Sequence, residues 1–593
     1  MGGLFSGTSM ATQQDSISVQ SYLLSRDALA RLDDDLGFRA HFEGDNIDEL
    51  QRLTPESSNE DTYKLYQRMV RIGYDPTEGV IKMEVIAADP ATSEAFANAL
   101  IGYAEEQVDQ LTAQTLKSYG DGICHAPTLD ALAANGVVFE TAYCNFPLCA
   151  PSRFSMATGQ LCSTVGAYDN AAEFSAEIPT YAHYLRAGGY QTALSGKMHF
   201  IGPDQFHGFE KRLTADLYPA DFAWVPNWEH EGKRDTNDPR AVRIAGVCHR
   251  SVQIDYDEEV THQAIQHIYD MARSDDPRPF FLQVSYTHPH EPYLCQKEYW
   301  DLYEDVEIPL PSVGPLSKDA HDPHSLRLLK DFGMLGVEFS DDEIRTAIRA
   351  YYGSISYIDH LVSRVLEPLK NTGADQNTVI IFTSDHGEML GERGMWFKKH
   401  FFEKSMHIPL IVNAPWIAPT RVQELVSLVD LLPTFNAIAG IDEAIEPLEG
   451  VDLLSLIGQR QGERRRKIYA EYLAETTPVP IFMIREGDYK YIASSVDGEL
   501  MFNMADDPDE RINLADDPTQ VTRMQMFREE CTQKWNEAAL TRAIKQSQKR
   551  RILVRSAMGE GEKQRWNHNE TGKDQVIWYR GEQGYNEWAF KHI

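Results

Sequence analysis

The chain has 593 residues, 42% of them hydrophobic and 25% charged, which is the composition of a globular enzyme and excludes a disordered or fibrous protein. A formal net charge of −34 and the absence of any apolar run of ~18 residues exclude non-specific binding to nucleic acid and membrane insertion, so we expect neither kind of partner. The seven cysteines have no regular spacing and the N-terminus lacks the basic and apolar regions of a secretory signal, so we expect a cytoplasmic protein.

Residues 1–108 differ in character from the rest of the chain. Apolar residues recur at three- and four-residue spacing in 24–38 and in 93–111, which predicts a helix in each range, and the run 79–89 between them predicts a strand. Several phrases between 21 and 112 resemble part of the periplasmic region of capsule polysaccharide export proteins of the chain-length-regulator type. We therefore expect an extra N-terminal α/β segment over 1–108.

From Asp109 on, apolar runs that end in polar residues alternate with helical patterns. The predicted strands lie in 190–196, 278–289, 378–387 and 408–415, and the predicted helices in 128–137, 178–189 and 347–369. This alternation predicts an α/β sandwich with a mainly parallel central sheet, whose ligand sites gather at the carboxyl ends of the strands. We place this catalytic domain at 109–460, and the short strands and turns that follow predict a smaller C-terminal α+β subdomain and tail at 461–593.

Polar residues with chemical potential follow these predicted strands. Asp385 and His386 come directly after the apolar run that begins at Thr378, and carboxylate and imidazole ligands in this position suit Ca²⁺, Mg²⁺ or Mn²⁺. The alternative for this pair is a helix N-cap beside a hydrogen-bonded histidine. The other motifs of this kind are C-A-P-S-R (149–153), G-K-M-H (196–199), T-H-P-H (287–290) and K-K-H-F-F-E (398–403).

The segment LCAPSRFSMATG (148–159) matches the sulfatase signature C-x-P-S-R-x-x-x-[LM]-T-G, with Ala157 at the Leu/Met position. From 109 to about 530 the chain resembles type I sulfatases, and the phrases GAYDNAAEF, SGKMHFIGPDQFHGFEKRL, DLYPADFAWVPNW and VSYTHPHEPY resemble their choline sulfatase branch. The resemblance implies an alkaline-phosphatase-like fold and an enzyme that hydrolyses a sulfuric ester, with choline O-sulfate as the expected substrate. A related sulfatase, or a phosphonate or phosphate ester hydrolase, is the alternative.

The same resemblance implies a catalytic apparatus. Cys149 would be oxidised by a formylglycine-generating enzyme to formylglycine, whose hydrate supplies the nucleophile, whereas the alternative for this residue is a buried structural cysteine. One divalent cation, with Ca²⁺ expected before Mn²⁺ or Mg²⁺, would be held by Asp109, Cys149, Asp385 and His386. The residues that would bind the sulfuryl group, the nucleophile or the leaving oxygen are Arg153, Lys197, His199, His290 and Lys398.

A choline ester also needs a site for its quaternary ammonium group. Aromatic faces and a carboxylate provide such a site. In the family, Trp224 and Glu475 hold positions that suit this task, and Asn170 holds a position near the sulfate; core packing for Trp224 and a solvated loop for Glu475 are the alternatives. The tail of the choline sulfatase branch reaches a neighbouring subunit, so we expect a homo-oligomer, although the tail that begins at Arg565 does not align with it.

The junction before Asp109 departs from the family pattern. An apolar strand is expected there, but FANALIGYAEEQ (96–107) has high helix propensity and contains two glutamates. A third possibility is therefore an inactive fusion that lacks its first catalytic strand. The strand predicted at 79–89 could insert into the sheet instead, and it would then present Asp89 in place of Asp109.

Overall fold

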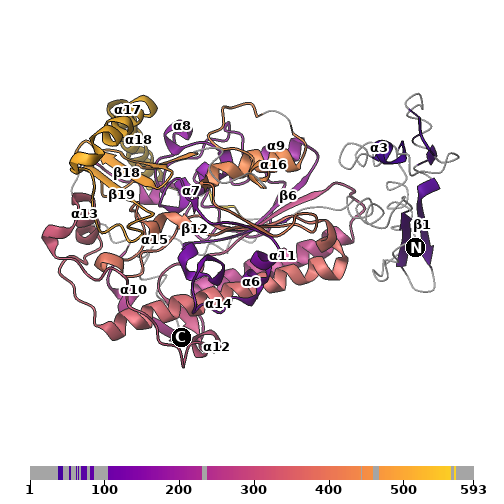
Figure 1. Ribbon diagram of the computed structural model, residues 1–593, viewed down its shortest axis with the longest axis horizontal. Helices are drawn as coiled ribbons and strands as arrows, with labels where there is room; N and C mark the ends of the chain where they lie inside the picture. Colours follow the sequence, from indigo (N-terminus) through magenta and orange to yellow (C-terminus); the bar gives the residue numbers. More distant parts are fainter. Residues whose placement is uncertain are drawn as a thin grey trace.

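The computed structural model describes residues 38–43, 52–54, 62, 64–65, 68–75, 80–85, 104–229, 237–441, 444–457, 466–562 and 566–568. A twisted eight-stranded sheet forms the centre of the molecule (Figure 1), with the strand order β14-β4-β13-β11-β3-β9-β6-β7. In chain order its strands are β3 (Ala104–Val108), β4 (Val137–Phe139), β6 (Gln191–Gly196), β7 (Lys211–Arg212), β9 (Phe280–Ser285), β11 (Ile380–Ser384), β13 (Leu410–Asn413) and β14 (Thr420–Val422).

The central sheet is mainly parallel, as predicted. In this sheet only β13 runs antiparallel to its neighbours β4 and β11, and the other adjacent strands run parallel. Since β11, β3, β9 and β6 are parallel, their carboxyl ends meet at one edge. The side chains of β6, β9 and β11 are almost all buried, which is the pattern of parallel strands covered on both faces.

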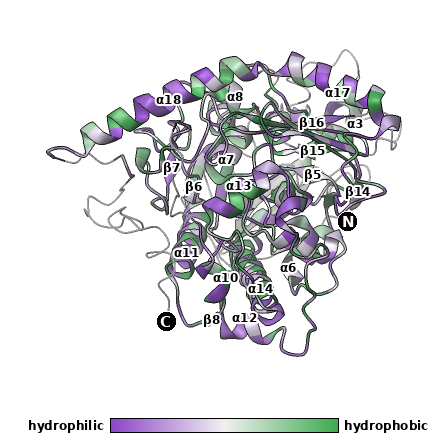
Figure 2. Ribbon diagram, turned by 90° about the vertical axis from the view of Figure 1, so that its left-hand side faces the viewer, coloured by the Kyte–Doolittle hydropathy of each residue, from purple (hydrophilic) through white to green (hydrophobic). Residues whose placement is uncertain are grey.

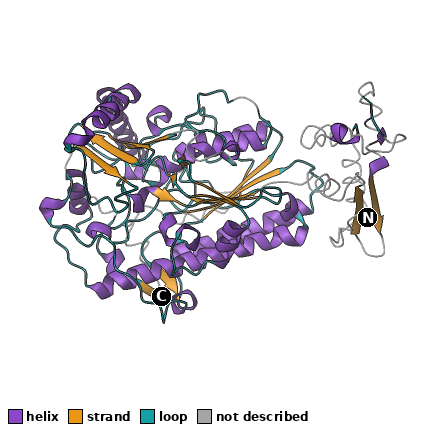
Figure 3. Cartoon of the chain, viewed as in Figure 1, coloured by secondary structure: helices purple, strands orange, loops and turns teal. Residues whose placement is uncertain are grey.

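Helices cover the two faces of the sheet and complete a sandwich (Figures 1 and 3). One layer contains α6 (Pro127–Ala134), α11 (Val252–Ala272) and α14 (Asp341–Thr372), and the other contains α7 (Cys149–Thr158), α9 (Tyr181–Ala187) and α16 (Leu431–Ile438). The predicted helices at 128–137, 178–189 and 347–369 are confirmed as α6, α9 and part of α14. Among the described residues, no helix is both long and apolar enough to cross a membrane.

Helix α14 shows how the sequence sets these elements. It begins at a capping box formed by Ser340 and Glu343, and its first turn is acidic, which suits the positive end of the helix dipole. It ends at Gly373, whose φ of 75° is accessible to glycine without strain. Buried residues recur along its length and pack it against α6 and α11.

The helix predicted over 93–111 is wrong where the structure describes it. Residues Ala104–Val108 form β3, which pairs in parallel with β11 on one side and β9 on the other. Two parallel neighbours satisfy the backbone of this strand from both sides, and this tertiary pairing overrides a helix propensity of a few tenths of a kcal/mol per residue. The strand that was predicted to be missing is therefore present, and the part of the predicted helix before residue 104 lies outside the described residues.

The strand predicted at 79–89 is confirmed as β2 (Val80–Val85). It pairs antiparallel with β1 (Val70–Asp75) in a two-stranded sheet of its own, so the prediction that it could enter the central sheet and present Asp89 is wrong. Of the helix predicted over 24–38, the described residues include only Phe38, which begins α3 (Phe38–Phe42).

After the central sheet the chain forms a smaller α+β unit. Four antiparallel strands run in the order β16 (Lys467–Tyr472), β17 (Ile481–Glu486), β18 (Tyr489–Ser494) and β19 (Gly498–Asn503). Two helices follow, α17 (Val521–Lys534) and α18 (Glu537–Met558), and Figure 2 shows them running along one side of the molecule with hydrophilic and hydrophobic residues alternating along their length. Arg551 of α18 donates to both carboxylate oxygens of Asp169, at 2.6 and 2.8 Å, so this helix is fastened to the catalytic body.

The remaining elements are short. A three-stranded sheet contains β12 (His407–Ile408), β5 (Ala142–Tyr143) and β15 (Val426–Ser427), and a parallel pair contains β10 (Leu294–Gln296) and β8 (Gly246–Cys248). The short helices are α8 (Cys162–Val165), α10 (Arg240–Arg243), α12 (Lys297–Asp301), α13 (Pro323–Asp331) and α15 (Glu403–Met406).

Candidate active site

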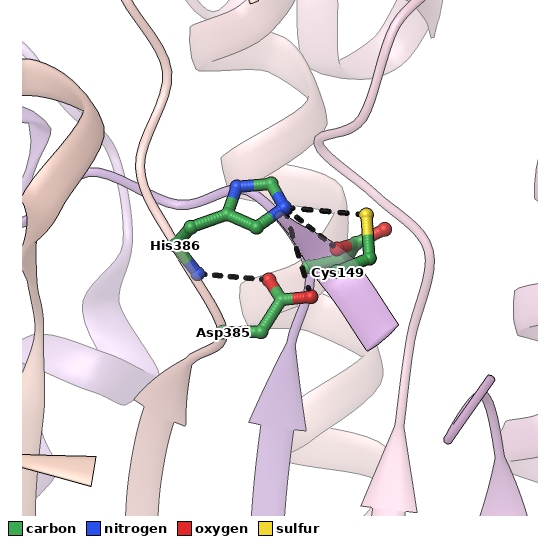
Figure 4. Close-up of side chains that lie close together, drawn as sticks. Cys149, Asp385 and His386 are labelled. Atoms are coloured by element: carbon green, nitrogen blue, oxygen red, sulfur yellow. Dashed lines mark hydrogen bonds and ion pairs between the residues drawn. The ribbon is translucent and has the colours of Figure 1, made fainter. Parts of the chain in front are cut away.

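Four side chains that could bind a metal ion gather at the carboxyl edge of the central sheet. Asp109 directly follows β3, Asp385 and His386 directly follow β11, and Cys149 is the first residue of α7. One ligand atom from each lies within 4.8 Å of the others, and all four residues are buried. Figure 4 shows Cys149, Asp385 and His386 converging above the ends of the strands, with Cys149 Sγ 3.2 Å from His386 Nε2.

The charges at this cluster favour a cation. Oδ1 of Asp109 is buried and accepts no hydrogen bond among the described residues. Burial would raise the pKa of Asp109, but Lys197, His290 and Arg153 hold it well below its usual value, so this carboxylate is ionised. Burial raises the pKa of Asp385 to about 6, and the nearby charge of Asp109 adds to the rise. A divalent cation between the two carboxylates would offset their repulsion, and oxygen and imidazole ligands fit Ca²⁺, Mg²⁺ or Mn²⁺.

Cys149 is held at the N-terminus of a helix with its sulfur inside the cluster. Leu148 has extended backbone geometry and precedes the first turn of α7, and the backbone N–H of Ala150 donates to Oδ1 of Asn170 at 3.0 Å. Burial would raise the pKa of the Cys149 thiol, but Lys197, Lys398 and His386 lower it well below its usual value. The site thus stabilises negative charge at the atom that Cys149 presents.

Arg153 contacts both aspartates of the cluster and the ends of two strands. Its Nε donates to Asp385 Oδ2 at 2.9 Å, and its Nη1 donates to the carbonyl of Lys197 at 2.6 Å and to Ser285 Oγ at 2.7 Å. Nη2 lies 3.4 Å from Asp109 Oδ1. Arg153 therefore orients both aspartates, in addition to adding positive charge near Cys149.

Lys197 and His199 enter the site after β6. Lys197 Nζ forms an ion pair with Asp109 Oδ2, and its backbone N–H donates to the carbonyl of Ser285 at 3.0 Å. His199 has a φ of 56°, and its backbone N–H donates to Asp216 Oδ2 at 2.7 Å. Burial lowers the pKa of His199 to about 4, and neither ring nitrogen has a hydrogen-bond partner among the described residues. A neutral imidazole in this position can bind a hydroxyl group beside residue 149.

His290 and Lys398 form a hydrogen-bonded pair beside the cluster. Lys398 Nζ donates to Gln110 Oε1 at 2.7 Å and to His290 Nε2 at 2.8 Å. Since an ammonium can only donate, His290 accepts at Nε2, and its Nδ1 donates to the carbonyl of Glu291 at 2.9 Å. The Lys398 ammonium is held in place by neighbouring carboxylates, which raise its pKa despite burial.

A pocket opens beside this cluster, and the three predicted substrate-binding residues line it. Asn170, Trp224 and Glu475 come from three distant segments and meet around the same cavity. The cavity is also lined by Leu148, Cys149, Tyr218, Asn237, His290, Glu291, Lys398 and Lys399. A ligand in the pocket would therefore have residue 149, Trp224 and Glu475 among the side chains around it.

Sequence reasoning missed several residues of the site. Tyr218 lines the pocket and its ring lies 4.5 Å from Lys197 Nζ, while Asp216 binds the backbone N–H groups of Met198 and His199. Both belong to the phrase DLYPADFAWVPNW that carried the family resemblance, so that signal was present in the sequence. Lys399 directly follows the predicted site residue Lys398. Side chains of adjacent residues usually point in different directions, so this adjacency did not predict that Lys399 lines the pocket. No motif or pattern in the sequence pointed to Asn237 as a residue of the site.

The comparisons with known proteins decide the family. The family model described as "Sulfatase" matches residues 107–441, and the model described as "N-sulphoglucosamine sulphohydrolase, C-terminal" matches residues 391–537. The chain belongs to the sulfatase family. This sulfatase is 42% identical over 477 residues to a choline-sulfatase of Rhizobium meliloti (strain 1021), which covers 79% of the chain and 93% of that protein.

Solved structures confirm the alkaline-phosphatase-like fold of this sulfatase. A phosphonate monoester hydrolase from Silicibacter pomeroyi superposes with a TM-score of 0.60 at 22% identity, over 73% of the chain and 95% of that structure. A structure described as a 2-O GAG sulfatase superposes with a TM-score of 0.57 at 22% identity, over 75% of the chain and 92% of that structure. The predicted fold class and the predicted sulfuric ester hydrolase are thereby confirmed.

Proposed function

We propose that this sulfatase hydrolyses choline O-sulfate to choline and sulfate, with Cys149 converted to formylglycine by a formylglycine-generating enzyme. The observation that carries the proposal is the cavity that Cys149, one of the four candidate metal ligands, lines together with Trp224 and Glu475. The relative described as a choline-sulfatase supports the same substrate. The central sheet includes β3 (Ala104–Val108), so the proposed catalytic domain contains this strand in addition to the expected range 109–460, and 461–593 is the proposed C-terminal subdomain and tail.

Asp109, Asp385, His386 and the modified residue 149 would hold one divalent cation, for which we propose Ca²⁺. When bound, the cation would draw negative charge from the sulfuryl oxygens, and hydrated formylglycine would supply the attacking hydroxyl and a second hydroxyl that restores the aldehyde. Both fit the chain, because the cluster contains an Asp109 oxygen that accepts no hydrogen bond from the described residues, and residue 149 projects into the cluster.

The residues of the chain would bind and orient the sulfuryl group. Lys197 and Lys398 are buried beside the cluster, and Arg153 fixes the two aspartates. Positive groups aimed at developing charge typically contribute ~10²–10³ each in kcat. His199, neutral and with open ring nitrogens, would hold a hydroxyl of residue 149.

His290 and Lys398 would assist the leaving oxygen. His290 Nε2 already accepts from the Lys398 ammonium, so in this arrangement Lys398 provides the protons that face the pocket. Transfer of a proton toward the departing alcohol would pass through this pair, and His290 Nδ1 is fixed by the Glu291 carbonyl.

The alcohol end of the ester would lie against Trp224 and Glu475, with Asn170 nearer to the sulfate. Trp224 packs edge-on to the ring of His199, with ring centroids 5.6 Å apart, and lies beside Tyr218. An aromatic face contributes ~0.5–2 kcal/mol to binding a quaternary ammonium. We further propose that the protein is a homo-oligomer in the cytoplasm, where its seven free cysteines would stay reduced.

Sulfate release from choline O-sulfate tests the proposal. The full chain is coexpressed with a formylglycine-generating enzyme, and mass spectrometry confirms the modified residue. Release that Cys149→Ala abolishes is the expected result. A folded, modified, metal-loaded enzyme that releases no sulfate from choline O-sulfate, but cleaves a phosphonate, a phosphate monoester or another sulfate ester in the same panel, would show that the substrate is wrong.

A further inference from the structure

A buried lysine stands directly beside the carboxylate that is proposed to bind the cationic end of the substrate. Lys399 Nζ lies 3.0 Å from Glu475 Oε1, and the two side chains are 2% and 8% exposed. Lys399 Nζ also lies 3.4 Å from Asn237 Oδ1 and 5.1 Å from the centre of the Phe332 ring. Lys399, Glu475 and Asn237 all line the pocket.

The position of Lys399 is fixed by an unusual backbone. Lys399 has a φ of 79°, in the left-handed region that a lysine rarely adopts. Its N–H donates to the carbonyl of Pro147 at 3.1 Å, and its carbonyl accepts from His324 Nε2 at 2.8 Å. Burial lowers the pKa of His324 to about 3, so its ring is neutral, and donation at Nε2 defines the tautomer.

The segment that carries Glu475 is held by the same short helix. Thr476 has a φ of 68°, its carbonyl accepts from Arg327 Nε at 3.0 Å, and its hydroxyl donates to Asp331 at 3.0 Å. His324, Arg327 and Asp331 all belong to α13. One helix therefore fixes both partners of the Lys399–Glu475 pair, although they lie on separate segments of the chain.

This pairing changes the charge that a ligand meets. A carboxylate alone would attract a quaternary ammonium, but an ammonium 3.0 Å from that carboxylate cancels most of the attraction and repels a second cation. We propose that Lys399 is a specificity-determining residue, which makes the alcohol-binding end of the pocket nearly neutral and lowers its preference for esters whose alcohol is a cation. The inference rests on the proposed function only in placing the alcohol at this end of the pocket.

A pair of esters of nearly equal shape isolates the effect. Choline O-sulfate carries a quaternary ammonium, and 3,3-dimethylbutyl sulfate replaces the nitrogen with carbon and is neutral at that end. Lys399→Met removes the charge and keeps an unbranched side chain of similar length, whereas Lys399→Arg keeps the charge. Both are made in full-length, metal-loaded protein carrying Cys149→Ala, so that binding is measured by calorimetry without turnover.

We expect Lys399→Met to tighten binding of choline O-sulfate relative to 3,3-dimethylbutyl sulfate by about 10-fold or more, since a like charge within the pocket is removed. Lys399→Arg should leave the ratio of the two dissociation constants near that of the parent. Loss of packing alone would weaken both esters together and leave the ratio unchanged, and that result would overturn the proposal. Failure of either ester to bind any variant would overturn it too, because the pocket would then not take the alcohol.

Failure of the proposed function would look different. Protein with formylglycine at residue 149 that releases no sulfate from choline O-sulfate, while the ratio of dissociation constants still shifts in Lys399→Met, would reject choline O-sulfate hydrolysis and keep the role of Lys399. Sulfate release from choline O-sulfate together with an unchanged ratio would do the reverse.

Discussion

Arg551→Met would remove the buried ion pair that fastens the C-terminal helix to the wall of the pocket. Arg551 binds both carboxylate oxygens of Asp169, and the two side chains are 6% and 0% exposed. In the variant the Asp169 carboxylate would remain buried with the hydrogen bond from the backbone N–H of Ala171, at 2.9 Å. Breaking a buried pair by removing one partner costs about 3–5 kcal/mol.

The same change should reach the substrate. Asp169 directly precedes Asn170, and Trp228, close to Trp224, donates its backbone N–H to Gln548 of α18 at 2.9 Å. The segments that carry Asn170 and Trp224 are therefore both fastened to this helix. We expect the KM for choline O-sulfate to rise about 10-fold, with a smaller change in kcat, because small displacements of positioning groups are costly.

Calorimetric unfolding and steady-state kinetics measure the two effects. The unfolding midpoint should fall by about 2–4 °C, because a loss of about 3–5 kcal/mol is divided by an unfolding entropy of roughly 1.2 kcal/mol/K for a chain of 593 residues. Arg550→Met is the matched control, since Arg550 is exposed on the same helix and should leave both readouts near those of the parent. The double variant Asp169→Asn, Arg551→Met should be less destabilised than the sum of the single variants. A midpoint and KM for Arg551→Met that equal those of Arg550→Met would refute the reasoning.

Three further outcomes follow from the geometry. Trp224→Ala should raise the KM for choline O-sulfate about 2- to 30-fold, from the ~0.5–2 kcal/mol of a cation–π contact, and an unchanged KM would place the alcohol elsewhere. Asp385→Asn should lose most of the bound divalent metal, measured by mass spectrometry of the protein, and lower kcat at least ~10²-fold; full metal content would contradict the ligand assignment. Burial lowers the pKa of His267 to about 4 and that of His324 to about 3, so the stability that these neutral rings contribute is complete above pH ~6.5 and falls as the pH drops toward 4, by up to about 1.4 kcal/mol per pH unit for each ring. His267→Gln should flatten the fall of the unfolding midpoint between pH 6.5 and 4, and an equally steep fall would argue against this cause.

The parts of the site that could be predicted from the sequence are those where a chemically reactive side chain lies in a recognisable short motif. Asp385 and His199 lie in short motifs at the ends of predicted strands, and parallel strands bring such ends to one edge, whereas Cys149 lies in the sulfatase signature. The structure places Cys149 and Asp385 in one cluster and His199 beside Trp224 of the adjoining pocket, and their catalytic roles remain predictions for the experiments above. Periodicity likewise predicted α6, α9 and α14, because amphipathic helices carry their pattern locally.

The parts that could not be predicted depend on contacts between distant segments. Ala104–Val108 has the composition of a helix, and only its two parallel neighbours make it a strand. Lys399 reaches the pocket because its backbone adopts a positive φ, and no local sequence pattern predicts this conformation. Asp169 and Arg551 are 382 positions apart, and nothing in the sequence of either segment indicates that the two residues pair.

The central place of β3 in the sheet also sets an order of events during synthesis. Of the strands of the central sheet, β3 is synthesised first. Just after this strand, Gln110 donates its backbone N–H to the carboxylate of Asp385, which lies 275 residues later in the chain. At ~5–20 residues per second, the ribosome needs roughly 15 to 55 s to supply that partner. Cys149 emerges early in this interval and is 3% exposed once the structure is complete. An enzyme that oxidises Cys149 would therefore reach it before β9 and β11, the strands that flank β3, have paired with it. The speed of translation would then influence how much of the protein becomes modified.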